Sequence, residues 1–181
     1  IENNQDLFLK WLEIAANNDS PVAQANLCRF YIKCQDKKNL AKDFGTKSAN
    51  AGCHLGIWHL ARFYKAEKNY EEEKNLLIKL AENGCKSALV RLGIILKRKK
   101  EFSEAFQKFK EAADRKSKRG IYHCGLELIN GKLTSKNVDE GLRLLNDAAD
   151  FGYIKAINKL IDIYKNGVDG VEKNLDMANQ Y

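Results

Sequence analysis

The sequence has almost no proline and no long apolar run. Pro21 is the single proline in 181 residues, so helices can continue almost uninterrupted along the chain. No apolar stretch approaches the roughly 18 residues of a membrane-spanning helix. The first residues, IENNQDLFLK, lack the basic start and apolar core of a signal peptide. The chain begins at Ile1 rather than Met, and we expect it to be part of a larger chain.

The residues and motifs of common active sites are also scarce. There are three histidines, His54, His59 and His123. The sequence has no phosphate-binding glycine loop, no metal-binding helix motif and no nucleophile elbow. The EEE run at 71–73 opens a predicted helix, where negative charge offsets the helix dipole. These absences predict a non-enzymatic protein with no catalytic residues, no metal site and no cofactor.

Five cysteines are present, an odd number whose spacings match no zinc-binding pattern. They are Cys28, Cys34, Cys53, Cys85 and Cys124. We interpret them as small buried hydrophobic residues in a reducing compartment. Charged residues make up 30% and hydrophobic residues 44% of the chain, which is typical of a soluble folded protein. We therefore favour the cytoplasm, with a secreted effector as the alternative.

A repeat runs through most of the chain. An alanine recurs at Ala16, Ala49, Ala81, Ala113 and Ala149, with gaps of 33, 32, 32 and 36 residues. Three residues later comes a turn residue, which is glycine in three copies, Asp19 in the first and Lys116 in the fourth. Small residues follow at seven, leucine (Cys124 in the fourth copy) at eleven, and tyrosine or leucine at fifteen residues after the alanine. Five copies that agree at these positions predict repeats of two antiparallel helices, which bury their apolar faces by stacking.

The expected fold is all-α, a superhelical solenoid of about five antiparallel helix-pair repeats that form one array over residues 1–181. Small residues let neighbouring helices approach closely, and the leucine and aromatic side chains fill the space between them. The predicted repeats span 4–34, 38–67, 70–98, 101–130 and 137–166, followed by a partial repeat at 174–181. The predicted helices lie near 4–17, 20–34, 38–50, 53–67, 70–83, 85–98, 101–114, 117–130, 137–150, 153–166 and 174–181.

The segment AADFGYIKAINKLIDIYKNGVDGVEKNLDMANQY, at 148–181, resembles the Sel1-like repeat, a relative of the tetratricopeptide repeat. The matching residues are Ala148, Ala149, Gly152, Ala156, Leu160, Tyr164, Gly167, Gly170, Val171 and Ala178. Residues 88–113 look more like a plain tetratricopeptide unit, with Leu92, Gly93, Ala105, Phe109 and Ala112 in place. The resemblance implies a right-handed superhelical scaffold, or adaptor, that binds other proteins. By analogy, the chain is a bacterial effector, regulator or toxin-neutralising partner.

The second helix of each predicted pair faces the concave side in arrays similar to tetratricopeptide repeats. Carried over to this chain, that geometry gives 30 positions, of which 11 are Lys or Arg and one is acidic. Average composition would place about five basic and four acidic residues there. The candidate partner-binding residues on this face are Arg29, Lys33, Trp58, His59, Arg62, Lys65, Arg91, Lys97, Arg98, Arg119, Tyr122, His123, Lys155, Asn158 and Lys159.

This basic face predicts a groove that binds a partner protein through an acidic segment or a carboxylate terminus, with Trp58 and Tyr122 as aromatic anchors. The alternative is that these lysines and arginines are ordinary solvated side chains on exposed helices. RNA or other single-stranded nucleic acid is a second alternative, although 24 acidic residues and the lack of a recognised binding motif disfavour it. A third is a structural spacer or a dimerisation module that uses the first or last helix.

Overall fold

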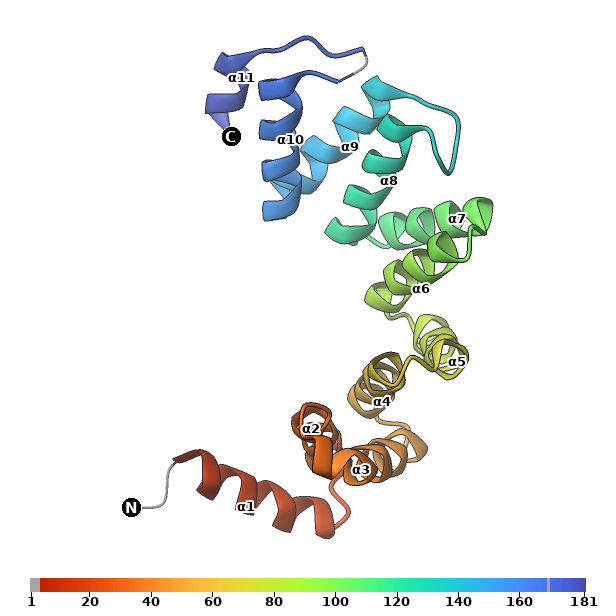
Figure 1. The fold of residues 1–181 in the computed structure, drawn as a ribbon, viewed down its shortest axis with the longest axis vertical. Coiled ribbons are helices and arrows are strands. Elements are labelled where there is room, and N and C mark those ends of the chain that lie inside the picture. Colours follow the sequence, from red (N-terminus) through yellow and green to blue (C-terminus); the bar gives the residue numbers. More distant parts are fainter. Residues whose placement is uncertain (1–3, 169) are drawn as a thin grey trace. The chain divides into compact units, whose positions relative to one another are not determined.

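The computed structural model describes residues 4–168 and 170–181, and helices joined by short turns make up this part of the chain (Figure 1). The α-helices are α1 (Asn4–Asn17), α2 (Pro21–Tyr31), α3 (Lys38–Asn50), α4 (His54–Ala66), α5 (Tyr70–Glu82), α6 (Lys86–Arg98), α7 (Phe102–Asp114), α8 (Lys118–Asn130), α9 (Val138–Asp150), α10 (Ile154–Asn166) and α11 (Leu175–Gln180). A short 3-10 helix, Gln35–Lys37, precedes α3. The all-α fold is confirmed. The predicted array also includes positions 1–3 and 169, which lie outside the described residues.

The turns that lead into α2, α4, α6, α8 and α10 share one backbone conformation. Their central residues all have positive φ, at Asp19 (57°), Gly52 (73°), Gly84 (84°), Lys116 (55°) and Gly152 (69°). Glycine adopts this conformation without strain, because it has no β-carbon to clash with the backbone. The next residue is the helix N-cap in every copy: Ser20, Cys53, Cys85, Ser117 and Tyr153. The repeated turn residue therefore sets where each of these helices begins.

The helices divide into two sets that alternate along the chain. We call α2, α4, α6, α8 and α10 the A helices, and α1, α3, α5, α7, α9 and α11 the B helices. The most extensive helix contacts are those of α2 with α3, α6 with α7 and α8 with α9. Each of these joins an A helix to the B helix that follows it.

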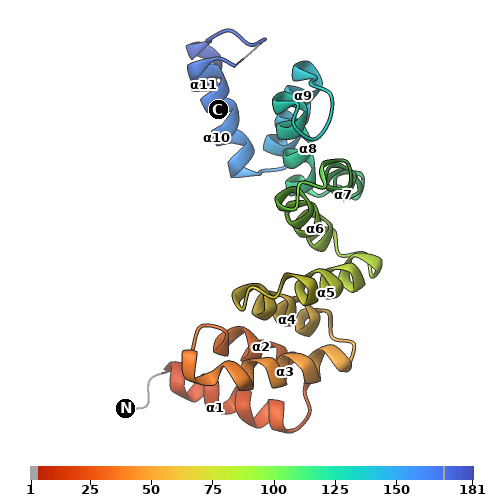
Figure 2. The ribbon, with the colours of Figure 1, turned by 45° about the vertical axis from the view of Figure 1, so that its right-hand side comes forward.

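The chain forms two compact units, and unit 1 comprises Ile1–Asn83. Here α1 packs on α2, α2 on α3 and α4, and α5 on α4 (Figure 2). Leu27, Tyr31, Leu60 and Phe63 belong to the buried core, and the first three lie at the leucine and tyrosine positions of the repeat. Their burial holds two A helices, α2 and α4, side by side in this unit.

Unit 2 comprises Gly84–Tyr181. Leu145, Leu160 and Ile163 are completely buried between α8, α9 and α10. Glycine permits a close helix approach here, because a β-carbon added at Gly125 would lie 2.8 Å from the carbonyl oxygen of Gly141. The last helix, α11, packs on α10, and the ring of Tyr181 stacks on that of Tyr164 at 6.2 Å. In this unit α6 and α8 are neighbours on the A side.

Candidate functional site

Charge is divided between the two helix sets. The A helices carry twelve Lys or Arg residues and two acidic residues. The B helices carry nine Lys or Arg residues and fifteen acidic ones. The excess of basic residues is thus carried by the helices on which the sequence places the candidate binding face.

In unit 1 the structure brings together three of the predicted residues, Arg29 of α2 and His59 and Arg62 of α4. The Nη1 atom of Arg62 lies 3.5 Å from Nδ1 of His59. Burial, together with the positive charges of Arg62 and Arg29, lowers the pKa of His59 to about 4. His59 is therefore neutral at neutral pH. Arg29 is exposed; of the other predicted residues in this unit, Lys33 and Lys65 are exposed, and Trp58 on α4 is half-buried.

The burial of His59 corrects one part of the sequence prediction. Its side chain is 4% exposed, so it lies in the core and not on a surface that a partner reaches. The repeat position that it shares with Asn26 and Lys159 is polar in all five copies, which made it look like part of a binding face. The arginines around it remain as the surface groups.

In unit 2 basic residues from three A helices surround His123. Its ring stacks on that of Phe109 with 4.7 Å between centroids and 12° between planes. Burial, together with the charges of Arg119, Lys97 and Lys155, lowers the pKa of His123 to about 4. These three cations come from α8, α6 and α10 respectively. The structure therefore gathers positive charge on one side of unit 2.

A shallow cleft lies beside this cluster, between α8 and α10. It encloses about 390 Å³ and is lined by Tyr122, Lys155, Asn158, Lys159 and Asp162. Four of these five residues belong to the predicted set. The ring of Tyr122 meets that of Tyr153 edge to face at 5.2 Å, and Nζ of Lys159 lies 3.5 Å from Oδ2 of Asp162. The cleft thus combines two ammonium groups, an amide, a carboxylate paired with one of the ammonium groups, and an aromatic wall.

Lys97 has a partner that sequence reasoning missed. Its ammonium forms an ion pair with Oε1 of Glu127, and this carboxylate is 1% exposed. The signal was present in the repeat, because the corresponding residues of the other copies are Phe30, Phe63, Ile95 and Ile163. A carboxylate in this apolar series needs a nearby cation. The remaining predicted residues of α6 are Arg91, which is half-buried, and Arg98, which is exposed.

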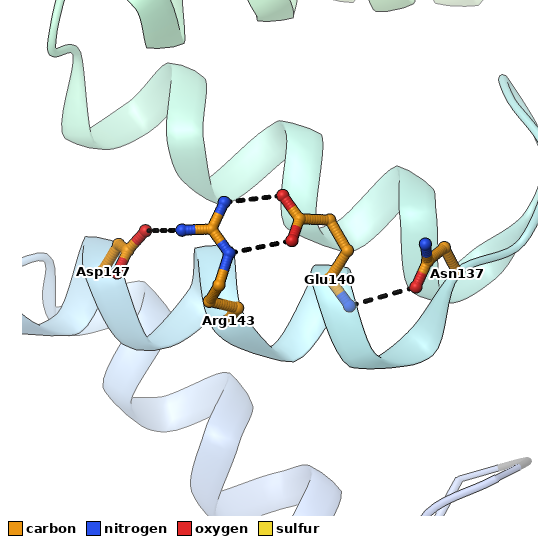
Figure 3. Close-up of polar contacts among 4 residues, drawn as sticks. All are labelled: Asn137, Glu140, Arg143 and Asp147. Atoms are coloured by element: carbon orange, nitrogen blue, oxygen red, sulfur yellow. Dashed lines mark hydrogen bonds and ion pairs between the residues drawn. The ribbon is translucent and has the colours of Figure 1, made fainter.

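The B helix α9 shows how charge is arranged on the other helix set (Figure 3). The guanidinium of Arg143 donates to both carboxylate oxygens of Glu140, at 2.6 and 2.8 Å, and to Asp147 at 3.1 Å. The side chain of Asn137 caps the helix by accepting from the backbone N–H of Glu140 at 3.1 Å. The hydrogen bonds from Arg143 hold the pKa of Glu140 below its usual value. The charge of Arg143 is thus paired with carboxylates of its own helix. Because α9 carries more acidic residues than its one arginine, this surface is acidic.

The cysteines differ from one another in their surroundings. Cys28 and Cys124 are buried, and burial raises the pKa of each thiol to about 12. Cys34, Cys53 and Cys85 are only partly buried, so the interpretation of all five as buried hydrophobic residues was too broad. Among residues 4–168 and 170–181 there is no cluster of three or more His, Cys, Asp or Glu side chains able to hold a metal ion.

No protein-family profile matches the sequence, and the comparison with curated proteins also gives no match. Solved structures do match. A protective antigen of uropathogenic Escherichia coli, described as displaying an SLR (Sel1-like repeat) fold, is 27% identical with a TM-score of 0.75 over 94% of this chain. A Sel1 repeat protein from Oxalobacter formigenes is 21% identical with a TM-score of 0.76 over 96%. The chain folds as a Sel1-like repeat protein.

A third Sel1-like repeat structure, described as a putative Sel1 repeat protein from Klebsiella pneumoniae, is 25% identical with a TM-score of 0.61 over 77% of this chain. The chain spans 38% of the length of the E. coli antigen, 75% of the Oxalobacter protein and 70% of the Klebsiella protein. Sel1-like repeat proteins generally serve as protein-interaction scaffolds. In the described part of the chain no helix is long and apolar enough to span a membrane.

Proposed function

We propose that this Sel1-like repeat chain is a protein-interaction scaffold whose A-helix surface in unit 2 binds an acidic segment of a partner protein. The observation that carries the proposal is the meeting of Lys97, Arg119 and Lys155 around His123, beside the cleft. Charge-assisted hydrogen bonds from ammonium and guanidinium groups to carboxylates are stronger than neutral ones. A carboxylate run of a partner that lies along α8 and α10 would meet such donors.

The contents of the cleft favour a carboxylate-bearing peptide. Lys155 and Lys159 are one helical turn apart on α10, with Asn158 between them, so their three donor groups face the same small space. Tyr122 supplies an apolar wall for an adjacent side chain. A short acidic segment, or the terminal carboxylate of a chain, fits these donors and this wall.

Nucleic acid fits the same surface less well. Binding of a single strand relies on aromatic rings whose faces are free for bases to stack on. The ring of Tyr122 instead meets His123 and Tyr153 edge to face, at 5.4 and 5.2 Å. We therefore favour a protein partner over RNA.

The direct test measures binding of a fluorescein-labelled, glutamate-rich peptide to the whole chain by fluorescence anisotropy. We expect Lys155→Glu/Lys159→Glu to weaken binding at least about tenfold, since each lost charge-assisted contact is worth about 1 kcal/mol at an exposed site. The matched control is Lys110→Glu/Lys132→Glu, which makes the same charge change at two exposed residues, one on the B helix α7 and one in the α8–α9 loop.

Two results would count against the proposal. Equal weakening by the control pair would show that only net charge matters, and no binding of the peptide at low salt would remove the acidic-segment site. A peptide with an amidated C-terminus separates the two forms of ligand, because only a terminal-carboxylate site loses affinity on amidation. A single-stranded oligonucleotide that binds more tightly than the peptide would favour the nucleic-acid alternative.

A further inference from the structure

The turn between α9 and α10 exposes two large apolar side chains next to the cleft. Phe151, which follows the last residue of α9, is 56% exposed, and Ile154, the first residue of α10, is 70% exposed. Tyr153 lies between them in the chain and is half-buried, and its ring meets that of Tyr122 edge to face at 5.2 Å. The two exposed residues therefore flank a tyrosine that packs on the aromatic wall of the cleft.

The repeat shows that packing between repeats does not explain these two side chains. Both lie in the turn before an A helix, and the equivalent residues of the first four copies are exposed, apart from the half-buried Pro21. The residues equivalent to Phe151 are Asn18, Ala51, Asn83 and Arg115, and those equivalent to Ile154 are Pro21, His54, Lys86 and Lys118. These positions stay on the surface although another repeat follows each of the four copies. Neighbouring apolar side chains on such a surface are typical of an interaction site.

Ile154 extends the cleft toward the start of α10. It lies four residues before Asn158, so the two side chains are one turn apart on the same face of the helix. Along α10 an apolar side chain thus comes first, followed by the donor groups of Lys155, Asn158 and Lys159. The carboxylate-bearing Asp162 lies about 12 Å from Ile154 along the helix axis. A ligand that lies along this helix therefore meets an apolar surface and then a basic one.

We infer that the acidic segment bound at this cleft also carries a large apolar side chain, which packs on Phe151 and Ile154. The inference rests on the proposed function, because Lys155 and Lys159 bind the carboxylates of the same segment. Ile154 and Lys159 are about 7.5 Å apart along the helix axis, and an extended chain advances about 3.3 Å per residue. The motif in the partner is therefore an apolar residue two or three positions away from an acidic one.

The apolar and the basic parts of this surface contribute differently to binding. Contacts between exposed charges are weak and are screened by salt, and they attract acidic molecules of many kinds. Burial of apolar surface does not depend on charge, and it favours a ligand whose side chain fits the patch. Phe151 and Ile154 would therefore make the site selective among acidic segments, and their contribution should persist as the salt concentration rises.

The test compares two fluorescein-labelled peptides by fluorescence anisotropy on the whole chain. One has a phenylalanine at the centre of a run of glutamates, so that an acidic residue lies two and three positions away on either side. The other has serine in place of the phenylalanine. We expect the phenylalanine peptide to bind about five- to tenfold more tightly. Both affinities should fall between about 50 and 300 mM salt, while their ratio stays nearly constant.

Phe151→Asn/Ile154→Gln should reduce the ratio of the two affinities to about one, because it removes both apolar side chains without a change of charge. Asparagine already occupies the position of Phe151 in two other copies, at Asn18 and Asn83. The matched control is Phe8→Asn/Val22→Gln, which makes the same changes at two side chains of unit 1 that are each 55% exposed. It should keep the wild-type ratio. Circular dichroism checks that each variant keeps its helices, and Ile154→Gln alone replaces the double variant if that one unfolds.

The outcomes separate this inference from the proposed function. Equal affinity of the wild type for the two peptides, lost in Lys155→Glu/Lys159→Glu, overturns the apolar contact and leaves the acidic-segment site. No binding of either peptide overturns both. A preference for phenylalanine that survives Phe151→Asn/Ile154→Gln places the apolar contact elsewhere and overturns the inference, as does an equal loss of the preference in the control pair.

Discussion

Lys97 and Glu127, on neighbouring A helices of unit 2, form an ion pair whose two members lie in different environments. The side chain of Lys97 is 40% exposed, whereas that of Glu127 is 1% exposed. Water therefore reaches the cation but not the carboxylate. Without Lys97, the carboxylate of Glu127 would be buried and uncompensated. Without Glu127, the ammonium of Lys97 would still be solvated.

This asymmetry predicts the outcome of a double-mutant cycle. Lys97→Met should lower the free energy of unfolding by about 2–3 kcal/mol, because it leaves a buried carboxylate without its cation. Lys97→Met/Glu127→Ile should recover most of that loss, since Ile95 and Ile163 fill the corresponding position in two other repeats. Urea titrations with unchanged m-values measure both. If Lys97→Met costs as much in the Glu127→Ile background, the pair carries no coupling.

The turn at Lys116 predicts a stabilising substitution. Lys116 has a φ of 55°, whereas Gly52, Gly84 and Gly152 occupy the same turn position in other repeats. A side chain in this left-handed conformation costs about 1 kcal/mol relative to glycine. Lys116→Gly should therefore raise the free energy of unfolding by about 0.5–1 kcal/mol, seen as a higher thermal midpoint.

Gly152 provides the reciprocal control for that prediction. A β-carbon added there would meet no atom within 4 Å, so Gly152→Ala introduces backbone strain without a clash. We expect it to destabilise the protein by about 1 kcal/mol. A gain at Lys116 without a loss at Gly152 would mean that the lysine side chain, and not the backbone, was the cause.

The helix N-caps predict two further gains in stability. The hydroxyls of Ser20 and Ser117 accept hydrogen bonds from the backbone N–H groups of Ala23 and Gly120, at 3.4 and 3.3 Å. Cys53 and Cys85 hold the same position on α4 and α6 but make no such bond. Cys53→Ser and Cys85→Ser should each stabilise the protein by about 0.5–1 kcal/mol. Cys85→Ala is the control, and an equal gain there would exclude capping as the reason.

His59 and His123 predict a loss of stability in acid. Their pKa values lie near 4 in the folded protein against about 6.5 in an unfolded chain. Between these values the unfolded state binds protons that the folded state does not, so the free energy of unfolding falls as the pH drops from about 6.5 to 4. For His59 the loss is on the order of 2–3 kcal/mol. His59→Gln should flatten this part of the stability profile, and an unchanged slope would contradict the assignment.

The sequence predicted the helices well because their determinants are local and repeated. Most helix ends lie within one residue of the prediction, since the turn residue and the N-cap recur in each copy. The end of α2 differs more, because the helix stops at Tyr31 and a short 3-10 helix follows, where the prediction extended to residue 34. Nothing in the repeat marks that early stop.

The properties of individual side chains were harder to predict, because they depend on neighbours from other repeats. His59 and His123 share a polar repeat position with Asn26 and Lys159, yet His59 is 4% exposed. Its burial follows from the packing of α2 and α4, which a single helix does not reveal. The burial of Glu127 was also missed, because its repeat position is apolar in the other copies. Only the ion pair with Lys97 accounts for a carboxylate there. A comparison of residues down each repeat position would have drawn attention to it.

The division of charge between A and B helices also gives unit 2 a permanent electric moment across its thickness. The net charge of +7 for the whole chain hides this separation, because the basic and acidic sets partly cancel. At low ionic strength, an acidic molecule that approaches is attracted to the unit and also orients it, so that the A helices face the molecule before contact. Above about 0.15 M salt the charges are screened beyond about 8 Å, and this alignment is confined to the last step of the encounter.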